Sequence, residues 1–322
     1  MNMLLLIGFV LLAVLCASCS STTGLPARTR GEPFTVVLGI AQDGGVPQAG
    51  SFDDPRWSRP EERRHAASLG IVDPSSGARW MIDATPDFRE QLLRLHRVAG
   101  GAGRPVLDGV LLTHAHIGHY TGLMFLGHES IGSSRIPAWA MPRMRAFLER
   151  NGPWSQLVAK ANIELRPLER DRPVELARGI RVTPILVPHR QEFSETVAFR
   201  VEGPGRSVLW MPDIDSWHEF DAMGTRIEDL IASVDVAYLD GTFFANGEIP
   251  GRDMTGFPHP FMTHTLERLT SLPEHERAKV RFIHLNHTNP ALHPQSVEAA
   301  RIRSAAMAVA TEGECLGLGM SR

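Results

Sequence analysis

Three histidines stand close together in the sequence, at His114, His116 and His119. His114 and His116 are two residues apart after an apolar stretch, and an extended backbone points such side chains to one side. His119 follows in a turn that can bring its ring back toward them. Neutral imidazole suits zinc and related cations, and three such ligands leave positions open for water. The spacing predicts a metal site; the alternative is a polar loop with solvated histidines.

The elements that must position this cluster alternate between strands and helices. An apolar strand over 106–112 runs directly into the histidines, and Thr85-Pro86-Asp87 has the composition of a helix start. Other strands are expected over 34–40, 68–72, 79–83, 136–140, 180–187, 197–201, 207–211, 234–239 and 280–285, with helices over 143–150 and 261–269. Runs of strands with interspersed helices indicate a single α/β layered domain.

Composition narrows the function classes. The chain has 322 residues, of which 43% are hydrophobic and 21% charged, so it can bury a large core and is not expected to be disordered. The net charge is −3, and no strongly basic block is present. Because nucleic-acid binding requires concentrated positive charge, we expect a small-molecule substrate and no nucleic-acid partner.

The first 19 residues have the pattern of an export signal. Residues 4–17 are almost wholly apolar, which is shorter than the roughly 20 residues that span a bilayer. Cys19, in Cys16-Ala-Ser-Cys19, resembles the acceptor cysteine of bacterial lipoproteins. We expect a signal peptide over 1–19, a linker over 20–33 and the folded domain over 34–322. The expected location is the periplasm, with a lipid on Cys19 as the only membrane contact; a simple cleaved signal is the alternative.

The histidine cluster resembles the first metal motif of the metallo-β-lactamase superfamily, His-x-His-x-Asp-His. Three later segments resemble its other motifs and end in Leu186-Val-Pro-His189, Leu209-Trp-Met-Pro-Asp213 and Phe282-Ile-His284-Leu-Asn-His287. The opening Gly39-Ile-Ala-Gln-Asp-Gly-Gly-Val-Pro-Gln48 and the closing Asn286-His-Thr-Asn-Pro290 are similar to the PQQ-biosynthesis protein B branch. This resemblance implies a metallo-β-lactamase-like four-layer αββα sandwich.

The resemblance also implies a role for each ligand. A first site would contain His114, His116, His189 and Asp213, and a second would contain His119, Asp213 and His287, with His287 favoured over His284. Gly118 stands where the superfamily has an aspartate, so the second site would lack one ligand. Asp215 and Asp240 are candidates to compensate, although solvated or capping roles are favoured for both.

These residues predict a metal-dependent hydrolase of an ester, lactone, amide or phosphodiester, with one or two zinc ions per chain and manganese or iron as alternatives. A bound metal would lower the pKa of its water toward about 7, and Asp213 would orient that water and move its proton. Two other classes stay open: an iron-dependent oxygenase of the PqqB-like type, and a non-catalytic metal-binding lipoprotein. For His259 and His264 the sequence favours loop or surface positions over a place in the substrate pocket.

Overall fold

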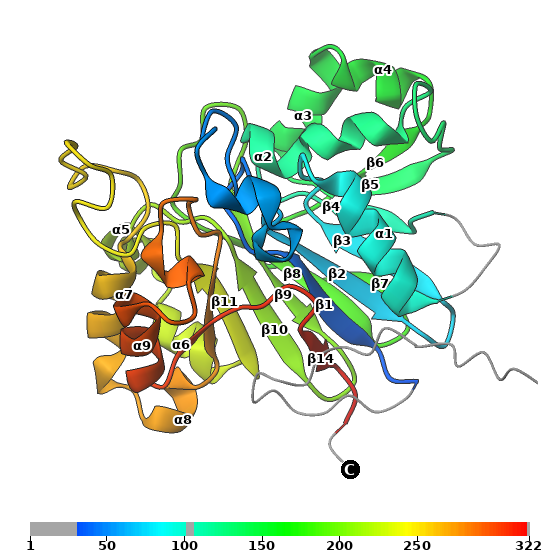
Figure 1. The fold of residues 1–322 in the computed structure, drawn as a ribbon. Helices are drawn as coiled ribbons and strands as arrows, with labels where there is room; N and C mark the ends of the chain where they lie inside the picture. The colour runs from blue at the N-terminus through cyan, green and yellow to red at the C-terminus, as the bar shows by residue number, and fades with distance from the viewer. Residues whose placement is uncertain (1–30, 101–105, 321–322) are drawn as a thin grey trace, which may run out of the picture.

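A computed structural model describes residues 31–100 and 106–320 (Figure 1). The expected signal peptide and residues 20–30 of the expected linker lie outside these residues. Within the described part, no helix is long and apolar enough to cross a membrane.

The first half of the chain builds a mixed seven-stranded sheet, which the last strand joins at its edge. In spatial order its strands are β14 (Cys315–Gly317), β1 (Phe34–Gly39), β2 (Ser68–Asp73), β3 (Ala78–Ile82), β4 (Gly109–Leu111), β5 (Ile136–Ala140) and β6 (Ile163–Pro167). The strands from β3 to β6 are parallel, whereas β14, β1, β2 and β3 pair antiparallel.

The second half of the chain builds a second seven-stranded sheet. In spatial order its strands are β13 (Ala308–Val309), β12 (Val280–Ile283), β11 (Val236–Asp240), β10 (Ser207–Met211), β9 (Val197–Glu202), β8 (Ile180–Leu186) and β7 (Val174–Ala177). The strands from β10 to β13 are parallel, and β7 to β10 pair antiparallel.

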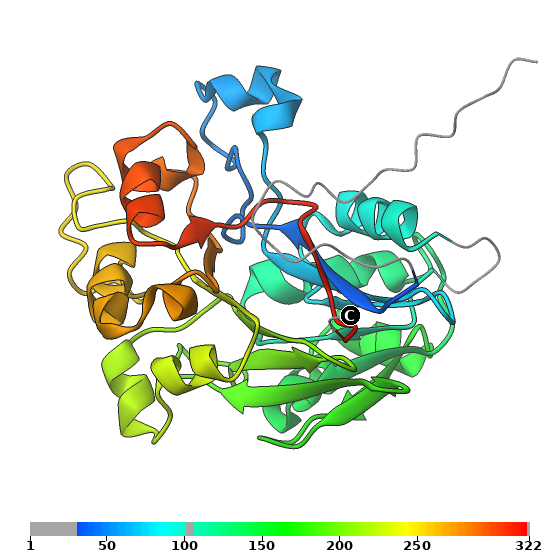
Figure 2. The same cartoon turned by 90° about the horizontal axis from the view of Figure 1, so that it is seen from below.

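Helices cover the outer face of each sheet (Figures 1 and 2). On the first sheet lie α1 (Phe88–Ala99), α2 (Ile117–Tyr120), α3 (Pro142–Arg150) and α4 (Trp154–Ala159). On the second lie α5 (Trp217–Ala222), α6 (Ile227–Ala232), α7 (Met262–Arg268), α8 (Glu274–Arg277) and α9 (Val297–Ser304). Short 3₁₀ helices span Pro55–Ser58, Pro60–Glu62, Thr121–Leu126, Leu269–Ser271 and Pro290–Leu292. These layers match the αββα sandwich that the sequence predicts.

Strand β10 shows how the sequence fills the layers. Side chains alternate across a strand, so Val208 and Trp210 pack into the core between the two sheets. Leu209 and Met211 pack on the opposite face, against the helices of the second half. A strand that is buried on both faces reads as a continuous apolar run, as this one does.

Helix α1 begins later than its sequence predicts. The expected cap at Thr85 and Pro86 lies before the helix, whose first residue is Phe88. Asp87 makes no side-chain cap; its carboxylate instead accepts a hydrogen bond from the backbone N–H of Ala66 at 2.7 Å. The carboxylate of Asp87 therefore makes a tertiary contact instead of capping the helix as local sequence rules would predict.

The two sheets meet where β1 ends. Ala41 forms β-bridges to both Ala66 and Leu285, which follows β12 in the second sheet. The backbone N–H of Gln42 donates to the carbonyl of Leu285 at 2.9 Å, and the N–H of Leu285 donates to the carbonyl of Ile40 at 2.9 Å. These bonds place the opening and closing sequence motifs side by side.

Candidate metal centre

Polar side chains converge where strands of both sheets end. His114 follows β4, Asp213 follows β10 and His284 follows β12. His189 follows β8, and His119 lies in the short helix α2. In sheets of this kind the loops beyond the carboxyl ends of parallel strands commonly form the ligand site.

The first group consists of His114, His116 and His189. One ring nitrogen of each lies within 4.8 Å of the others. The closest pair is His116 Nδ1 and His189 Nε2, which are 3.0 Å apart. The structure therefore brings together the three histidines that the sequence assigned to one site.

The second group consists of Asp43, His119 and His284, whose potential ligand atoms also lie within 4.8 Å of one another. Asp43 Oδ1 is 3.1 Å from His119 Nε2 and 3.3 Å from His284 Nε2. Sequence reasoning placed only His119 in this group. Asp43 stood in the opening motif without a role, and His284 was the less favoured of two histidines.

Asp213 lies between the two groups and faces both. Its Oδ1 atom is 3.6 Å from His189 Nε2 in the first group. Its Oδ2 atom is 3.1 Å from His119 Nε2 and 3.5 Å from His284 Nε2 in the second. This is the arrangement expected of a carboxylate shared between two metal positions.

Each ring in the two groups is held through its outer nitrogen. The pairs are His114 Nδ1 with Thr113 Oγ1 (2.9 Å), His116 Nε2 with Glu192 Oε2 (3.2 Å), His119 Nδ1 with Asp83 Oδ2 (2.7 Å), His189 Nδ1 with Asp215 Oδ1 (2.6 Å), and His284 Nδ1 with Thr242 Oγ1 (2.9 Å). Metal-binding histidines are oriented in this way, because the outer partner fixes the ring and leaves the other nitrogen for the ion.

Three buried atoms of the centre make no hydrogen bond among the described residues: His114 Nε2, His119 Nε2 and Asp213 Oδ2. The last two lie 3.1 Å apart, but this contact is an ion pair that does not have hydrogen-bond geometry. An unsatisfied buried polar group costs about 1–3 kcal/mol, so native proteins rarely leave several together. All three belong to the same cluster of potential metal-binding residues. Imidazole and carboxylate donors suit zinc, manganese or iron, and the residues present therefore fit a bound metal ion.

The electrostatics of His114 and Asp213 favour metal binding, whereas a metal at His119 would have to displace a proton. Burial acts to lower the pKa of His119, but the charges of Asp213 and Asp83 outweigh it and raise the pKa well above its usual value. Burial lowers the pKa of His114 well below its usual value, and the neighbouring His119 acts in the same direction. For Asp213, burial acts to raise the pKa, but the charges of His284 and His119 outweigh it and hold the pKa well below its usual value. A neutral imidazole and an ionised carboxylate are the forms that bind metals.

His287 lies apart from the candidate centre, contrary to the preference drawn from the sequence. Among the described residues it belongs to no group of potential ligands, and its backbone carbonyl accepts a hydrogen bond from Arg56 Nη2 at 3.0 Å. The reason lies in the turn after β12, where His284 has a left-handed φ of 63°. The chain changes direction there, so the first histidine of the motif faces the centre and the second does not.

Asp215 and Asp240 bind the outer nitrogens of histidines instead of replacing the missing carboxylate. Asp215 holds His189, and Asp240 Oδ2 lies 2.7 Å from Nδ1 of His259. Neither aspartate belongs to a group of potential ligands within the described ranges. Their role in this geometry is to orient rings.

His259 is a residue that sequence reasoning undervalued. It is buried, and it groups with Asp213 and His284. Burial acts to lower its pKa, but the ion pair with Asp240 raises the pKa of His259 to about 8. Its φ of 103° is rare for a residue with a side chain, and such strain clusters at functional sites. The prolines on both sides were the sequence signal for a rigid loop.

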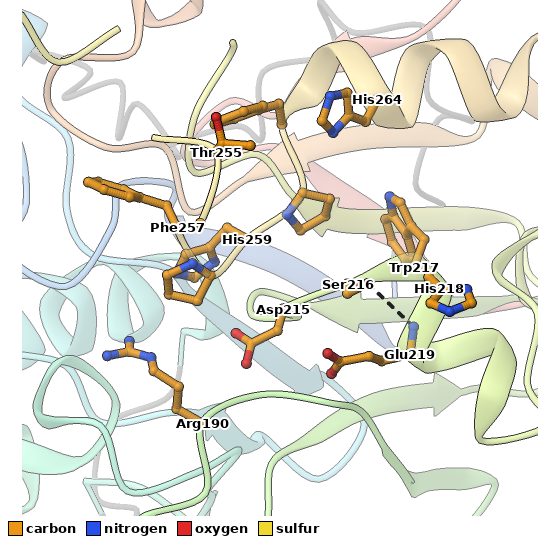
Figure 3. A pocket seen from close by; sticks show the side chains of 14 residues that line it. Arg190, Asp215, Ser216, Trp217, His218, Glu219, Thr255, Phe257, His259 and His264 are labelled. Carbon is orange, nitrogen blue, oxygen red and sulfur yellow. Dashed lines mark hydrogen bonds between the residues drawn. The ribbon is translucent and has the colours of Figure 1, made fainter. Parts of the chain in front are cut away.

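A pocket of about 660 Å³ opens beside the centre (Figure 3). His259 and Asp215, which contact the centre, form part of its wall. Charged, aromatic and polar side chains complete the lining, including Arg190, Trp217, His218, Glu219, Phe257 and His264. A small molecule in this pocket would therefore lie next to the two groups of potential ligands.

Comparisons with known proteins agree with this geometry. A family model described as "Beta-lactamase superfamily domain" matches residues 78–308. Coenzyme PQQ synthesis protein B of Xanthomonas axonopodis pv. citri (strain 306) is 26% identical over 306 residues, which cover 86% of this chain and 97% of the relative. The similarity to the PQQ-biosynthesis protein B branch that the motifs predict is thus confirmed.

Two solved structures share the fold. Zinc-bound PqqB from Methylobacterium extorquens superposes with a TM-score of 0.73 and 23% identity, over 88% of this chain and 100% of that one. A diphosphatase from the PhnP family superposes with a TM-score of 0.61 and 23% identity, over 88% of this chain and 96% of that one. The predicted four-layer architecture is confirmed.

Proposed function

The chain belongs to the beta-lactamase superfamily domain family, and from that premise we propose that it is a metal-dependent hydrolase of a small molecule. The observation that carries the proposal is the pair of ligand groups with Asp213 between them, in which three buried atoms make no hydrogen bond within the described chain. A diphosphatase from the PhnP family has the same fold, which supports hydrolysis as the class of reaction.

The first metal would be held by the first group together with Asp213, and the second by His119, His284 and Asp213. His284 takes the place that the sequence had given to His287. We propose zinc as the metal, with manganese or iron as alternatives. The structurally similar PqqB of Methylobacterium extorquens is zinc-bound, which supports zinc.

A bound metal would lower the pKa of a water molecule and polarise a carbonyl or phosphoryl oxygen of the substrate. The chain's own residues would do the rest. Asp213 lies between the groups with a pKa held well below its usual value, so it would stay ionised and accept a hydrogen bond from the water, which orients the water near the reacting atoms. His259 is fixed by Asp240 at the pocket wall, where it can hold a proton close to a leaving group.

The pocket supports a small ester, lactone, amide or phosphodiester as the substrate class. Its volume of about 660 Å³ is within the range of small-molecule sites. The guanidinium of Arg190 and the ring of Phe257 line it together, so it offers both a positive charge and an apolar surface.

Elemental analysis joined to a hydrolase screen tests the proposal. We expect one or two zinc or manganese ions per chain and turnover of at least one substrate class, with both reduced in His116→Ala. His218→Ala, in the pocket but outside both groups, is the control that should keep its metal. Predominant iron after anaerobic purification would favour the oxygenase alternative, and metal without turnover would favour the non-catalytic one.

We also propose that the protein is exported to the periplasm and that Cys19 carries a lipid anchor. The support is the apolar run over residues 4–17 and the small residues before Cys19. Fractionation of cells that express the chain and its Cys19→Ser variant tests this. Membrane association should be lost in the variant; equal distribution of both proteins would contradict the anchor.

A further inference from the structure

We propose that Asp43 supplies, from a loop distant in sequence, the carboxylate that the superfamily motif carries at position 118, and so completes the second metal position. The inference rests on the proposed metal centre. It assigns a role to Gly118 as well, because the glycine then makes room for a ligand that arrives from elsewhere.

The space at position 118 is already occupied. A Cβ atom built on Gly118 would lie 2.4 Å from both Cγ and Oδ1 of Asp43, and 2.5 Å from its Cβ. Unbonded carbon atoms in proteins approach to about 3.5 Å at the closest comfortable distance. A side chain at 118 and the carboxylate of Asp43 therefore exclude each other, and both are directed at the same position.

The Asp43 carboxylate also lies near the histidine nitrogens that are available to a metal. His119 and His284 present Nε2 to Asp43 Oδ1, while their Nδ1 atoms are held by Asp83 and by Thr242. Asp213 Oδ2 also approaches these two Nε2 atoms, at 3.1 Å from His119 and 3.5 Å from His284. Asp43 Oδ1 and Asp213 Oδ2 thus each approach the same two imidazole nitrogens, and two imidazoles with two carboxylates are four donors of the kinds that zinc takes.

The backbone explains how a distant loop reaches this point. Asp43 stands two residues after Ala41, which bridges to Leu285, and Leu285 is the neighbour of His284. Just beyond Asp43, a backbone hydrogen bond from Gly45 to Gln42 closes a tight turn at 2.8 Å. Gly45 has a φ of 68°, a conformation that glycine adopts without strain. Main-chain contacts on both sides of Asp43 therefore fix the backbone that carries the carboxylate.

An ordinary ion pair is the competing reading, in which Asp43 only neutralises His119. The two readings differ in metal content. If Asp43 were only an ion-pair partner of His119, Asp43→Ala would bind as many metal ions as the native chain. Adding Gly118→Asp to that variant would then not change its metal content. Gly118 has no positive φ, so its backbone can accept an aspartate.

The test is a ligand swap, read by zinc content after dialysis and by calorimetric zinc titration. Asp43→Ala should lose one zinc per chain, or bind it at least about tenfold more weakly, and keep the other. Asp43→Ala with Gly118→Asp should regain the second zinc. Gly118→Asp alone should not bind more than the native chain, because the new side chain collides with Asp43. Asp53→Ala, an exposed acid of the same loop, is the matched control.

The outcomes separate this inference from the proposed function. Two zinc ions in the native chain that persist in Asp43→Ala would overturn the inference and leave the hydrolase proposal intact. No zinc in the native chain would overturn both. If Asp43→Ala does not fold, Asp43→Asn preserves the side-chain volume, and retention of both zinc ions in that variant at native affinity would equally overturn the inference.

Discussion

The two groups of potential ligands are assembled in different ways. The first group takes two of its three histidines from a single segment, where a strand ends and a short helix begins. The second takes Asp43, His119 and His284 from three segments, and 241 residues separate the first of these from the last. A group formed by local spacing can be read from sequence, whereas a group formed by the pairing of distant strands cannot.

The groups also differ in exposure. In the second group the side chain of Asp43 is 36% exposed, whereas in the first group the most exposed side chain, that of His116, is 17% exposed. The second group therefore reaches solvent on the Asp43 side. Asp83 connects the two groups, because it holds His119 directly and also bonds the Thr113 hydroxyl that contacts His114. Changes in one group are thus expected to affect the other to a limited extent.

The largest effect is expected at the residue that both groups share. Asp213→Ala should remove a ligand from each metal position, so both ions are lost and turnover falls by more than the ten- to hundredfold that is usual for outer partners. Metal analysis and turnover measure this. Asp229→Ala, an exposed acid of α6, should match the native chain. Retention of two ions by Asp213→Ala would show that the groups are independent.

Removing one histidine from each group should separate them. His189→Ala is expected to lose the first ion and His284→Ala the second, because each deletes one imidazole from one group only. His287→Ala should keep both ions, since its ring lies apart. Zinc titration distinguishes the three. If His287→Ala lost an ion and His284→Ala did not, the assignment of the second group would be wrong.

Outer partners should give a smaller and equally selective effect. Asp215→Asn leaves His189 without its anionic partner, and Thr242→Val leaves His284 without its hydroxyl partner. Each should weaken zinc binding at its own group by about 10- to 100-fold. Competition with a zinc chelator measures both affinities. Equal weakening of both positions by either variant would argue for one coupled centre.

The smallest effect concerns the base of the Asp43 loop. Ile40 and Ala41 donate backbone hydrogen bonds to the carbonyl of His65, whose ring lies 3.0 Å from Glu312. The hydrogen bond between the His65 ring and the carboxylate of Glu312 raises the pKa of His65 above its usual value, although burial acts to lower it. Because the folded pKa is the higher one, the contribution to stability is complete below the unfolded pKa and is lost as pH rises through the folded pKa.

Urea denaturation of the metal-free protein at about pH 6 and pH 9 measures this contribution, which should be under about 1 kcal/mol. The difference between the two pH values should shrink in His65→Gln, which cannot titrate. An unchanged difference in that variant would assign the pH dependence to other groups.

The sequence predicted what depends on local pattern. The layered fold, the first group and Asp213 follow from apolar strands that end in residues able to bind a metal. The sequence also indicates that Gly118 replaces the aspartate of the superfamily motif. Asp43 could not be assigned, because its position depends on a bridge between Ala41 and Leu285 in different sheets. The choice between His284 and His287 depended on one left-handed residue in a turn. The position of His259 depended on its buried contact with Asp240, a residue 19 positions earlier in the chain.

A crystal of the zinc-loaded protein, measured on both sides of the zinc absorption edge, tests the central claim most directly. We predict two anomalous peaks, one bound by the three histidines of the first group and one by Asp43, His119 and His284. Asp213 should lie between them, with ligand distances of about 2.0–2.2 Å. A single peak, or a second peak that Asp43 does not contact, would contradict the account.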